Sequence, residues 1–276
     1  MNVIKQMSVN GIMGIAMTFV LILGGIDLSV GSLIALTSVC AAFFARQSLD
    51  LPLIVPIAVS LLVGVAAGAI NGFGIAYVGI SPFIMTLAMM SCLRGLAQVL
   101  SNGSPIFGLS KPFNGIANGF VLGIPNLVYF LLVILVIGIF VLRKTVFGKW
   151  VYAIGGNEVS ARLSGINTRW IKVVVYMGSG LLAGVCGVLM ASRITSGSPI
   201  IGVGYELNAI SAAVIGGVSM SGGTGNLLGT LIGALIIGVI QNGLDILGVS
   251  AFYQQIIQGL IIMVAVFLDI KSKSRI

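Results

Sequence analysis

Few side chains in this 276-residue chain could take part in catalysis or bind a metal ion. Because the chain has no histidine, Ser-His and Cys-His nucleophilic pairs and the usual histidine metal sites are excluded. Cys40, Cys92 and Cys186 stand singly in apolar runs without metal-ligand or redox spacing, so we interpret them as small core residues. We therefore expect no catalytic residue, no metal and no cofactor, and we do not expect an enzyme.

The glycine-rich run GGVSMSGGTGN, residues 216–226, superficially resembles a phosphate-binding loop. It lacks the Lys-Ser/Thr pair after its last glycine, and it lies between apolar runs rather than after a strand of a βαβ unit. The sequence therefore predicts that this chain does not hydrolyse ATP by itself.

Two charged residues lie inside apolar stretches. A carboxylate that faces lipid at mid-depth costs about 2.5–3.5 kcal/mol or more, so Asp27 must face protein, water or an interface. It either caps a helix that starts near Ser29, which we favour, or lines a polar path. Arg94 must extend to the membrane surface or bind a partner such as a backbone carbonyl group.

The composition indicates an integral membrane protein. Hydrophobic residues make up 58% of the chain and charged residues 7%, and the mean hydropathy is +1.18. The net charge of +8 does not indicate nucleic-acid binding, because nine of the fourteen cations lie in two places. Six are in the segment from Arg143 to Lys172, and three are Lys271, Lys273 and Arg275 at the end. We therefore expect membrane lipid to surround this chain.

The apolar runs predict an all-α polytopic helical bundle of about nine spans with broken helices, built as one transmembrane domain of residues 1–276. A span needs about twenty apolar residues to cross roughly 30 Å of hydrocarbon. The candidate spans are Ser8–Gly24, Ser29–Ala45, Leu53–Val78, Phe83–Leu100, Asn126–Leu142, Val173–Ile194, Leu207–Ser219, Leu227–Leu244 and Phe252–Leu268.

The segment Arg143–Lys172 is the longest polar interruption, and Glu158 is its single acid. Its six basic residues favour a cytoplasmic position, because Lys and Arg gather in cytoplasmic loops. We expect a short helix that begins at Glu158, is capped by Asn157 and stops at Gly165. The segment is either a connector that sets topology or a docking helix for a cytoplasmic partner. In the second case the apolar contact would consist of Ala161, Leu163 and Ile166.

The order of the spans predicts the orientation of the chain. Four candidate spans follow the polar segment, so the C-terminus should also be cytoplasmic. Five precede it, so the N-terminus and the loop Ser101–Pro125 should lie outside.

Two stretches of the chain echo each other. Residues 24–31 read GGIDLSVG and residues 216–223 read GGVSMSGG, with six of eight positions identical or conservative. Paired glycine interruptions are typical of a transport path, although small residues also mark close helix contacts. The polar residues that could line such a path are Asp27, Ser29, Asn71, Asn208, Ser219 and Ser221.

Five motifs, in order, resemble the ribose-type permeases of bacterial sugar ABC importers, from about Asn2 to Lys273. They are GGIDLSVGSL, NGSPI, YAIGGNEVSARLSGI, GYELNAISAAVIGGVSMSGGTG and GTLIGALIIGVIQNGLDILGVS. The resemblance implies a permease subunit that moves a monosaccharide, with ribose favoured, across the bacterial inner membrane. It also implies a homodimer that assembles with a cytoplasmic ATP-binding subunit and a periplasmic sugar-binding protein.

The resemblance further implies that the polar segment holds the helix that couples the permease to the ATP-binding subunit. The corresponding residues are Ala153, Gly155, Gly156, Asn157, Glu158, Ala161, Arg162, Leu163, Gly165 and Ile166. Family members usually carry one more N-terminal span, which this sequence lacks. The alternative is an ion-coupled secondary transporter of a small polar solute, which would need intramembrane carboxylates where the chain offers only Asp27.

Overall fold

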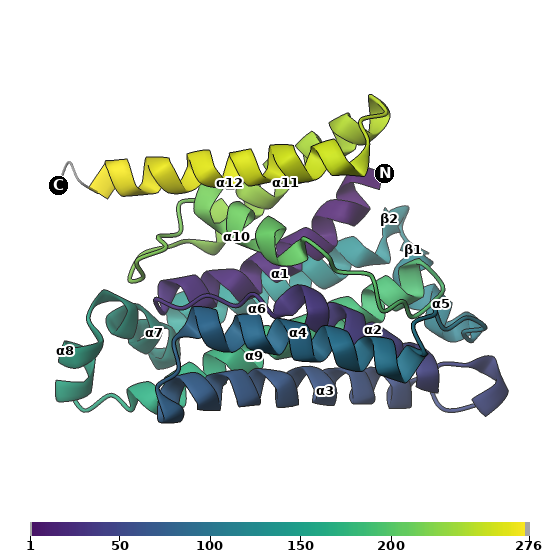
Figure 1. Ribbon diagram of the computed structural model, residues 1–276, viewed down its shortest axis with the longest axis horizontal. Helices are drawn as coiled ribbons and strands as arrows, with labels where there is room; N and C mark the ends of the chain where they lie inside the picture. Colours follow the sequence, from purple (N-terminus) through teal and green to yellow (C-terminus); the bar gives the residue numbers. More distant parts are fainter. Residues whose placement is uncertain (1, 274–276) are drawn as a thin grey trace. The chain divides into compact units, whose positions relative to one another are not determined.

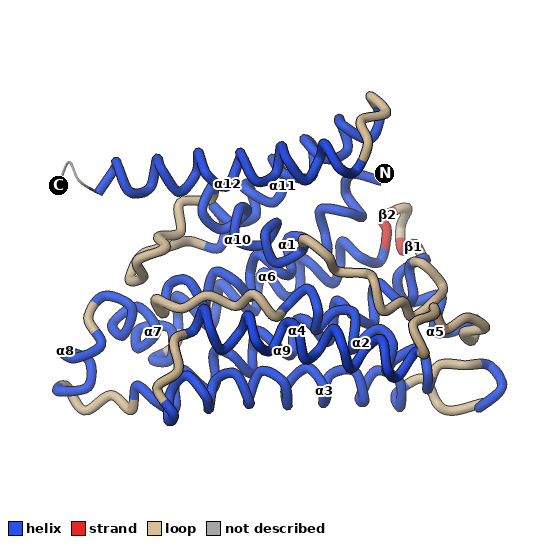
Figure 2. Tube along the Cα trace, in the orientation of Figure 1, coloured by secondary structure: helices blue, strands red, loops and turns tan. Residues whose placement is uncertain are grey.

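The computed structural model describes residues 2–273 (Figure 1). Apart from a hairpin of β1 (Phe120–Val121) and β2 (Ile124–Pro125), the regular structure of these residues is helical (Figure 2). The helices that coincide with the nine predicted segments are α1 (Asn2–Ile22), α2 (Val30–Phe44), α3 (Ile54–Phe73), α4 (Pro82–Ser101), α6 (Asn126–Lys144), α9 (Thr168–Arg193), α10 (Tyr205–Ile215), α11 (Leu227–Ile246) and α12 (Ala251–Lys273). Arg275, which the sequence marks as part of the basic end, lies outside the described residues.

Six helical stretches within the described residues are long and apolar enough to cross a membrane. They are Ile4–Ile22, Ile54–Val78, Pro82–Ser101, Asn126–Lys144, Thr168–Arg193 and Leu227–Ile246. The helices α2 and α10 are apolar but shorter, with 15 and 11 residues, or about 22 and 16 Å at 1.5 Å per residue. The prediction of a polytopic helical membrane protein is confirmed.

Three further helices lie where the sequence is more polar. The segment after α6 contains α7 (Val146–Gly156) and α8 (Glu158–Leu163), and the loop before the hairpin contains α5 (Lys111–Asn118). The sequence predicted only α8 among these. Short helical turns are also formed by Gln47–Leu49 and, as a π-helix that continues α3, by Gly74–Val78.

The chain divides into two compact units. Unit 1 comprises Met1–Ile26, Leu131–Ile171 and Leu207–Ile276, and unit 2 comprises Asp27–Phe130 and Lys172–Glu206. In unit 1, α1 is buried over most of its length and packs along α11. The hydroxyl groups of Thr18 and Thr230 lie 2.6 Å apart in this contact, so each polar group is satisfied within the apolar interior.

In unit 2, α2 is buried and packs against both α3 and α4. A row of glycines on α3, at Gly64, Gly68 and Gly72, meets the backbone of α9. A Cβ atom on Gly64 would collide with the carbonyl oxygen of Gly180, and a Cβ atom on Gly180 would collide with that of Gly64. Because there is no hydrophobic effect between helices in lipid, such small residues permit the close van der Waals packing that holds the helices together.

Three connections of unit 2 are joined by backbone hydrogen bonds. Arg46, just after α2, pairs with Leu109, and Ile106 pairs with Gly197, just after α9. In the second pair each N–H donates to the carbonyl oxygen of the other residue, at 2.8 and 2.9 Å. The ends of α2, α4 and α9 therefore lie together at one end of the unit.

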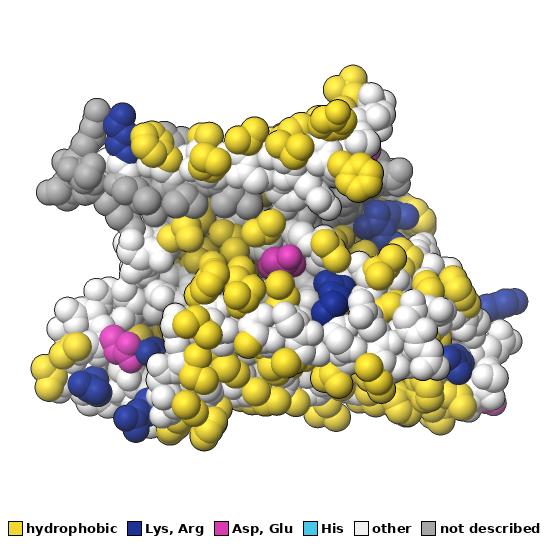
Figure 3. Space-filling view, in the orientation of Figure 1, with side chains coloured by type: hydrophobic (Ala, Val, Ile, Leu, Met, Phe, Trp, Pro, Cys, Tyr) yellow, Lys and Arg dark blue, Asp and Glu magenta, His cyan; other side chains and the backbone are white. Residues whose placement is uncertain are grey.

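Large apolar side chains are exposed along the outer helices. Leu62 on α3, Val99 on α4 and Val136 on α6 are 68%, 71% and 64% exposed. Apolar side chains are spread over the visible face in Figure 3, where charged residues gather at only a few places. Exposed apolar surface of this extent is anomalous in water and ordinary in lipid.

Candidate functional site

The helix α8 forms as its sequence predicts. The Asn157 side chain accepts a hydrogen bond from the Ser160 N–H at 2.9 Å and so caps the first turn, where Glu158 also lies. At the other end, Gly165 adopts φ +85°, and the N–H groups of Gly165 and Ile166 donate to the carbonyl oxygens of Arg162 and Ala161. This is a Schellman closure, which favours glycine at the left-handed position.

The surface of α8 differs from the prediction in one respect. Leu163 is 83% exposed and Val159 is 58% exposed, and their spacing of four residues puts them on one face. Ala161 is buried and Ile166 is half-buried. Of the three residues that the sequence assigned to an apolar contact, Ala161 is thus turned inward, while Val159, which was not among them, is exposed. Glu158 and Arg162 are exposed beside this apolar pair.

The preceding helix, α7, carries the first three predicted coupling residues. Ala153 and Gly156 are exposed, whereas Gly155 is half-buried against the chain at the end of α1. A Cβ atom on Gly155 would collide with the carbonyl oxygen of Ile22 and lie 2.6 Å from the backbone nitrogen of Gly223. Because only a glycine fits so close an approach, Gly155 has a packing role within unit 1.

Three of the six predicted path residues form one hydrogen-bonded cluster in unit 2. The Asp27 carboxylate accepts hydrogen bonds from the backbone N–H of Ser29 at 3.0 Å and from its hydroxyl group at 2.6 Å. The same hydroxyl oxygen accepts from the Asn71 side chain at 2.9 Å. Asp27 also accepts from the hydroxyl group of Ser179 at 2.8 Å. Asp27 thus caps the turn before α2, at Ser29, rather than the first helical residues.

Sequence reasoning missed Ser179. It is one of several serines in apolar runs, and nothing local distinguishes it. All four residues of the cluster, Asp27, Ser29, Asn71 and Ser179, are at most 2% exposed. Such burial with full hydrogen bonding of the carboxylate stabilises the turn that precedes α2.

The other three path candidates belong to unit 1 and do not form one cluster. Asn208, on α10, accepts hydrogen bonds from the side chains of Gln241 at 2.9 Å and Gln258 at 2.6 Å. Gln241 in turn accepts from Asn10 at 3.3 Å, so carboxamides from four helices are linked. Ser219 accepts from the N–H of Ser221 at 3.1 Å within the loop after α10.

Arg94 has the partners that its position in a span requires. Its Nη1 donates to the backbone carbonyl oxygens of Pro199 and Ile201, at 2.8 and 2.7 Å. The prediction of a backbone-carbonyl partner is confirmed. The guanidinium group thereby holds the irregular segment between α9 and α10.

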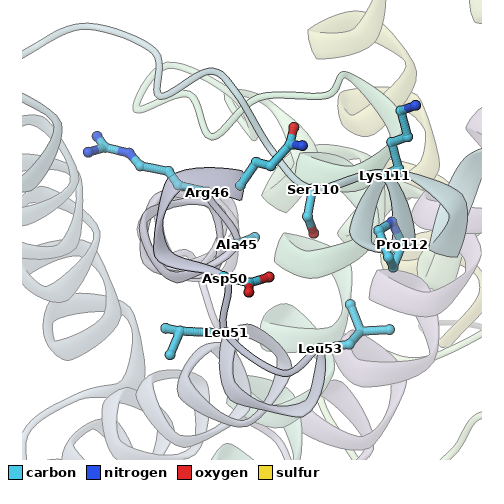
Figure 4. A pocket seen from close by; sticks show the side chains of 9 residues that line it. Ala45, Arg46, Asp50, Leu51, Leu53, Ser110, Lys111 and Pro112 are labelled. Carbon is cyan, nitrogen blue, oxygen red and sulfur yellow. The ribbon is translucent and has the colours of Figure 1, made fainter.

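A pocket of about 320 Å³ lies in unit 2 between the end of α2 and the start of α5 (Figure 4). It is lined by Ala45, Arg46, Gln47, Asp50, Leu51, Leu53, Ser110, Lys111 and Pro112. The Asp50 and Ser110 side chains point toward its interior, while Arg46 points away, with its guanidinium carbon 5.0 Å from the centre of the Phe43 ring. None of the six path candidates lines this pocket.

Comparison with known proteins identifies the family. Residues 1–266 match the family described as the permease component of branched-chain amino acid transport systems. The chain belongs to this family. The permease is 44% identical over 273 residues to the ribose import permease of Haemophilus influenzae, which covers 98% of this chain and 84% of that protein.

Two other relatives are similar over nearly the whole permease. The ribose import permease of Escherichia coli K12 is 44% identical, over 99% of this chain and 85% of its own length. The D-allose transport permease of the same strain is 39% identical, over 97% and 82%. No solved structure matches the chain. The resemblance stated from the motifs is confirmed: the permease is a multi-pass transport subunit of a bacterial ABC importer, not an enzyme.

Proposed function

We propose that this permease carries a monosaccharide, with ribose favoured, across the bacterial inner membrane in an ATP-driven importer. The observation that carries the proposal is the 44% identity to ribose import permeases from Haemophilus influenzae, Escherichia coli and Bacillus subtilis over nearly the whole chain. A permease named for D-allose transport is 39% identical to this chain, and one named for L-arabinose transport is 42% identical. Because relatives named for three sugars match nearly the whole chain, the substrate class is better supported than the individual sugar.

We propose a single transmembrane domain, residues 1–276, of about nine spans, in which α2 and α10 are the short broken ones. With residues 143–172 in the cytoplasm, and with successive spans crossing the membrane in opposite directions, residues 45–53, 101–125 and 194–206 are assigned to the outside. The backbone bridges of Arg46 with Leu109 and of Ile106 with Gly197 support this, because they join those three connections within unit 2. The same alternation assigns the C-terminus to the cytoplasm.

The proposed partners are a second permease copy, a cytoplasmic ATP-binding subunit and a periplasmic sugar-binding protein. The contact with the ATP-binding subunit is assigned to α8, whose capped ends make it a defined short helix. Its exposed Val159 and Leu163 offer an apolar centre, flanked by the exposed charges of Glu158 and Arg162. Apolar anchors with a charged rim are typical of a protein interface.

We propose that the predicted path residues lie beneath the surface along which the sugar moves, and that they help to hold that surface in place. Asp27, Ser29, Asn71, Asn208 and Ser219 are at most 7% exposed in the single chain, so a sugar would reach them only after helices separate. Ser221 is the exposed member of the set. The neutral hydrogen-bonding groups of the set, those of its serine and asparagine members, suit a sugar that must bind weakly and leave.

The first test concerns the partner. The permease is purified with its ATP-binding subunit as wild type, as Leu163→Glu and as Leu122→Glu, a leucine that is 93% exposed at the β1–β2 turn. We expect Leu163→Glu alone to lose the ATP-binding subunit. Equal recovery of that subunit with both variants would contradict the assignment of α8.

The second test concerns the energy source and the sugar. Uptake of labelled ribose is measured in cells that lack their own ribose permease, with D-allose and L-arabinose as competitors. An ATP-driven importer continues when an ionophore collapses ion gradients and stops when ATP is depleted. The opposite pattern would favour the ion-coupled transporter.

A further inference from the structure

The loop between α10 and α11 is held by side chains from α6 and α7 within unit 1. The Tyr152 hydroxyl group donates a hydrogen bond to the carbonyl oxygen of Gly225 at 2.8 Å. The Arg143 guanidinium group donates to the side-chain oxygen of Asn226 at 3.0 Å. Asn226 itself caps α11, because the same oxygen accepts from the Leu228 N–H at 3.1 Å. These contacts therefore connect the start of α11 to the polar segment.

The backbone of α7 also touches the same loop directly. A Cβ atom on Gly222 would lie 2.7 Å from the carbonyl oxygen of Gly155, and one on Gly223 would lie 2.9 Å from the Cα of Gly156. The Gly223 N–H donates to the carbonyl oxygen of Ile22 at 2.8 Å, which joins the end of α1 to the loop. Residues 222–226 thus lie where the end of α7 meets the end of α1.

The helices α1 and α10 end with the same kind of turn, a left-handed glycine followed by a backbone hydrogen bond to the last helical turn. After α1, Gly24 is left-handed, at φ +84°, and the Gly25 N–H donates to the carbonyl oxygen of Val20. After α10, Gly217 is left-handed, at φ +83°, and the Val218 N–H donates to that of Ala213. These are the two glycine-rich stretches that echo each other in the sequence. In the structure Gly24 corresponds to Gly217, whereas the sequence alignment of the two stretches pairs Gly24 with Gly216.

Between α7 and α8 there is a single residue, Asn157, and its N–H donates to the carbonyl oxygen of Ala153 at 3.0 Å. So short and bonded a link means that a displacement of α8 also displaces the end of α7. The end of α7 in turn cannot move without disturbing residues 222–226, because no space separates the two backbones.

We infer that residues 222–226 receive the displacement of α7 and α8 and pass it to α11 and the end of α1, with Tyr152 as the positioning residue. This inference rests on the proposed function, in which α8 binds the ATP-binding subunit. It gives a role to part of the glycine-rich run 216–226, which does not have the features of a phosphate-binding loop. Glycines suit this role because they allow the close backbone approach.

The test separates ATP hydrolysis from sugar movement. Tyr152→Phe removes only the hydroxyl group that holds Gly225. The importer is reconstituted with its ATP-binding subunit and its ribose-loaded binding protein, and the number of ATP molecules hydrolysed per ribose moved is measured. We expect this number to rise about 3- to 10-fold in the variant, because the transmitting contact loses one hydrogen bond. The matched control is Tyr129→Phe, whose hydroxyl group donates to the carbonyl oxygen of Val121 at 3.0 Å in unit 2. We expect its ratio to equal that of the wild type.

A second pair of variants covers the case in which Tyr152→Phe fails to assemble. Arg143→Gln removes the contact with Asn226, and Lys144→Gln removes the neighbouring positive charge. An unchanged ratio in Tyr152→Phe, or in Arg143→Gln where the first variant does not assemble, would overturn the inference. Equal losses of hydrolysis and uptake would overturn it too. If the wild-type chain neither binds the ATP-binding subunit nor moves ribose, the proposed function fails, and this inference fails with it.

Discussion

The Asp27 carboxylate accepts a hydrogen bond from the Ser179 hydroxyl group at 2.8 Å, across a separation of 152 residues. Asp27 precedes α2 and Ser179 lies on α9, so the bond ties the start of one helix to the middle of another within unit 2. The carboxylate is 1% exposed and has three donors around it. It is a structural centre of that unit.

Asp27→Ala should lower the stability of the permease strongly. It leaves three buried donors without an acceptor, each at a cost of about 1–3 kcal/mol, whereas Ser179→Ala removes one of the bonds. We expect the midpoint of thermal unfolding in detergent to fall most in Asp27→Ala, less in Ser179→Ala and not at all in Ser48→Ala, which changes an exposed serine. A wild-type midpoint in Asp27→Ala would contradict this role.

Two glycines on α9 should respond differently to the same substitution. A Cβ atom on Gly180 collides with the carbonyl oxygen of Gly64, so Gly180→Ala forces α3 and α9 apart. A Cβ atom on Gly178 meets no atom within 4 Å. Overpacking costs about 1–3 kcal/mol, while alanine in an open helical position is neutral or slightly favourable. Thermal unfolding of both variants measures the difference, and equal midpoints would show that the α3–α9 contact is not tight.

Arg94→Met should loosen the segment between α9 and α10. The carbonyl oxygens of Pro199 and Ile201 lose a charged donor, and such bonds contribute about 1.5–3 kcal/mol. Hydrogen exchange of residues 195–204 should then become roughly 10- to 100-fold faster, with little change elsewhere in unit 2. Lys111→Met, at an exposed site, is the control. Unchanged exchange in Arg94→Met would mean that other contacts hold the segment.

Asn157→Ala should weaken binding of the ATP-binding subunit. Loss of a helix cap costs about 1 kcal/mol, which would reduce affinity about fivefold if α8 must be folded to bind. Asn157→Asp keeps an acceptor for the Ser160 N–H and should bind as the wild type does. Asn167→Ala is the matched control, because it removes an equivalent cap, the bond from the Trp170 N–H at 3.1 Å, outside α8. Equal affinities of Asn157→Ala and Asn167→Ala would contradict the prediction.

Local patterns predicted the helices well. Each of the nine apolar segments coincides with a helix, and α8 begins and ends where Asn157 and Gly165 predict. The sequence did not predict α7, because its residues belong to a polar interruption that we expected to be helical only from Glu158 onward. It also did not separate the short α2 from the six long apolar helices, although the 13-residue segment Leu207–Ser219 already marked α10 as short.

The sequence by itself determined the membrane class, the helical segments and the caps of α8, because each depends on residues within a few positions of one another. Only the tertiary structure decided that Ser179 donates to Asp27, that Ala161 faces inward and that Gly155 meets Ile22. These contacts depend on which faces of the helices meet. In spans that are apolar all round, the periodicity of hydrophobic residues carries no record of that choice.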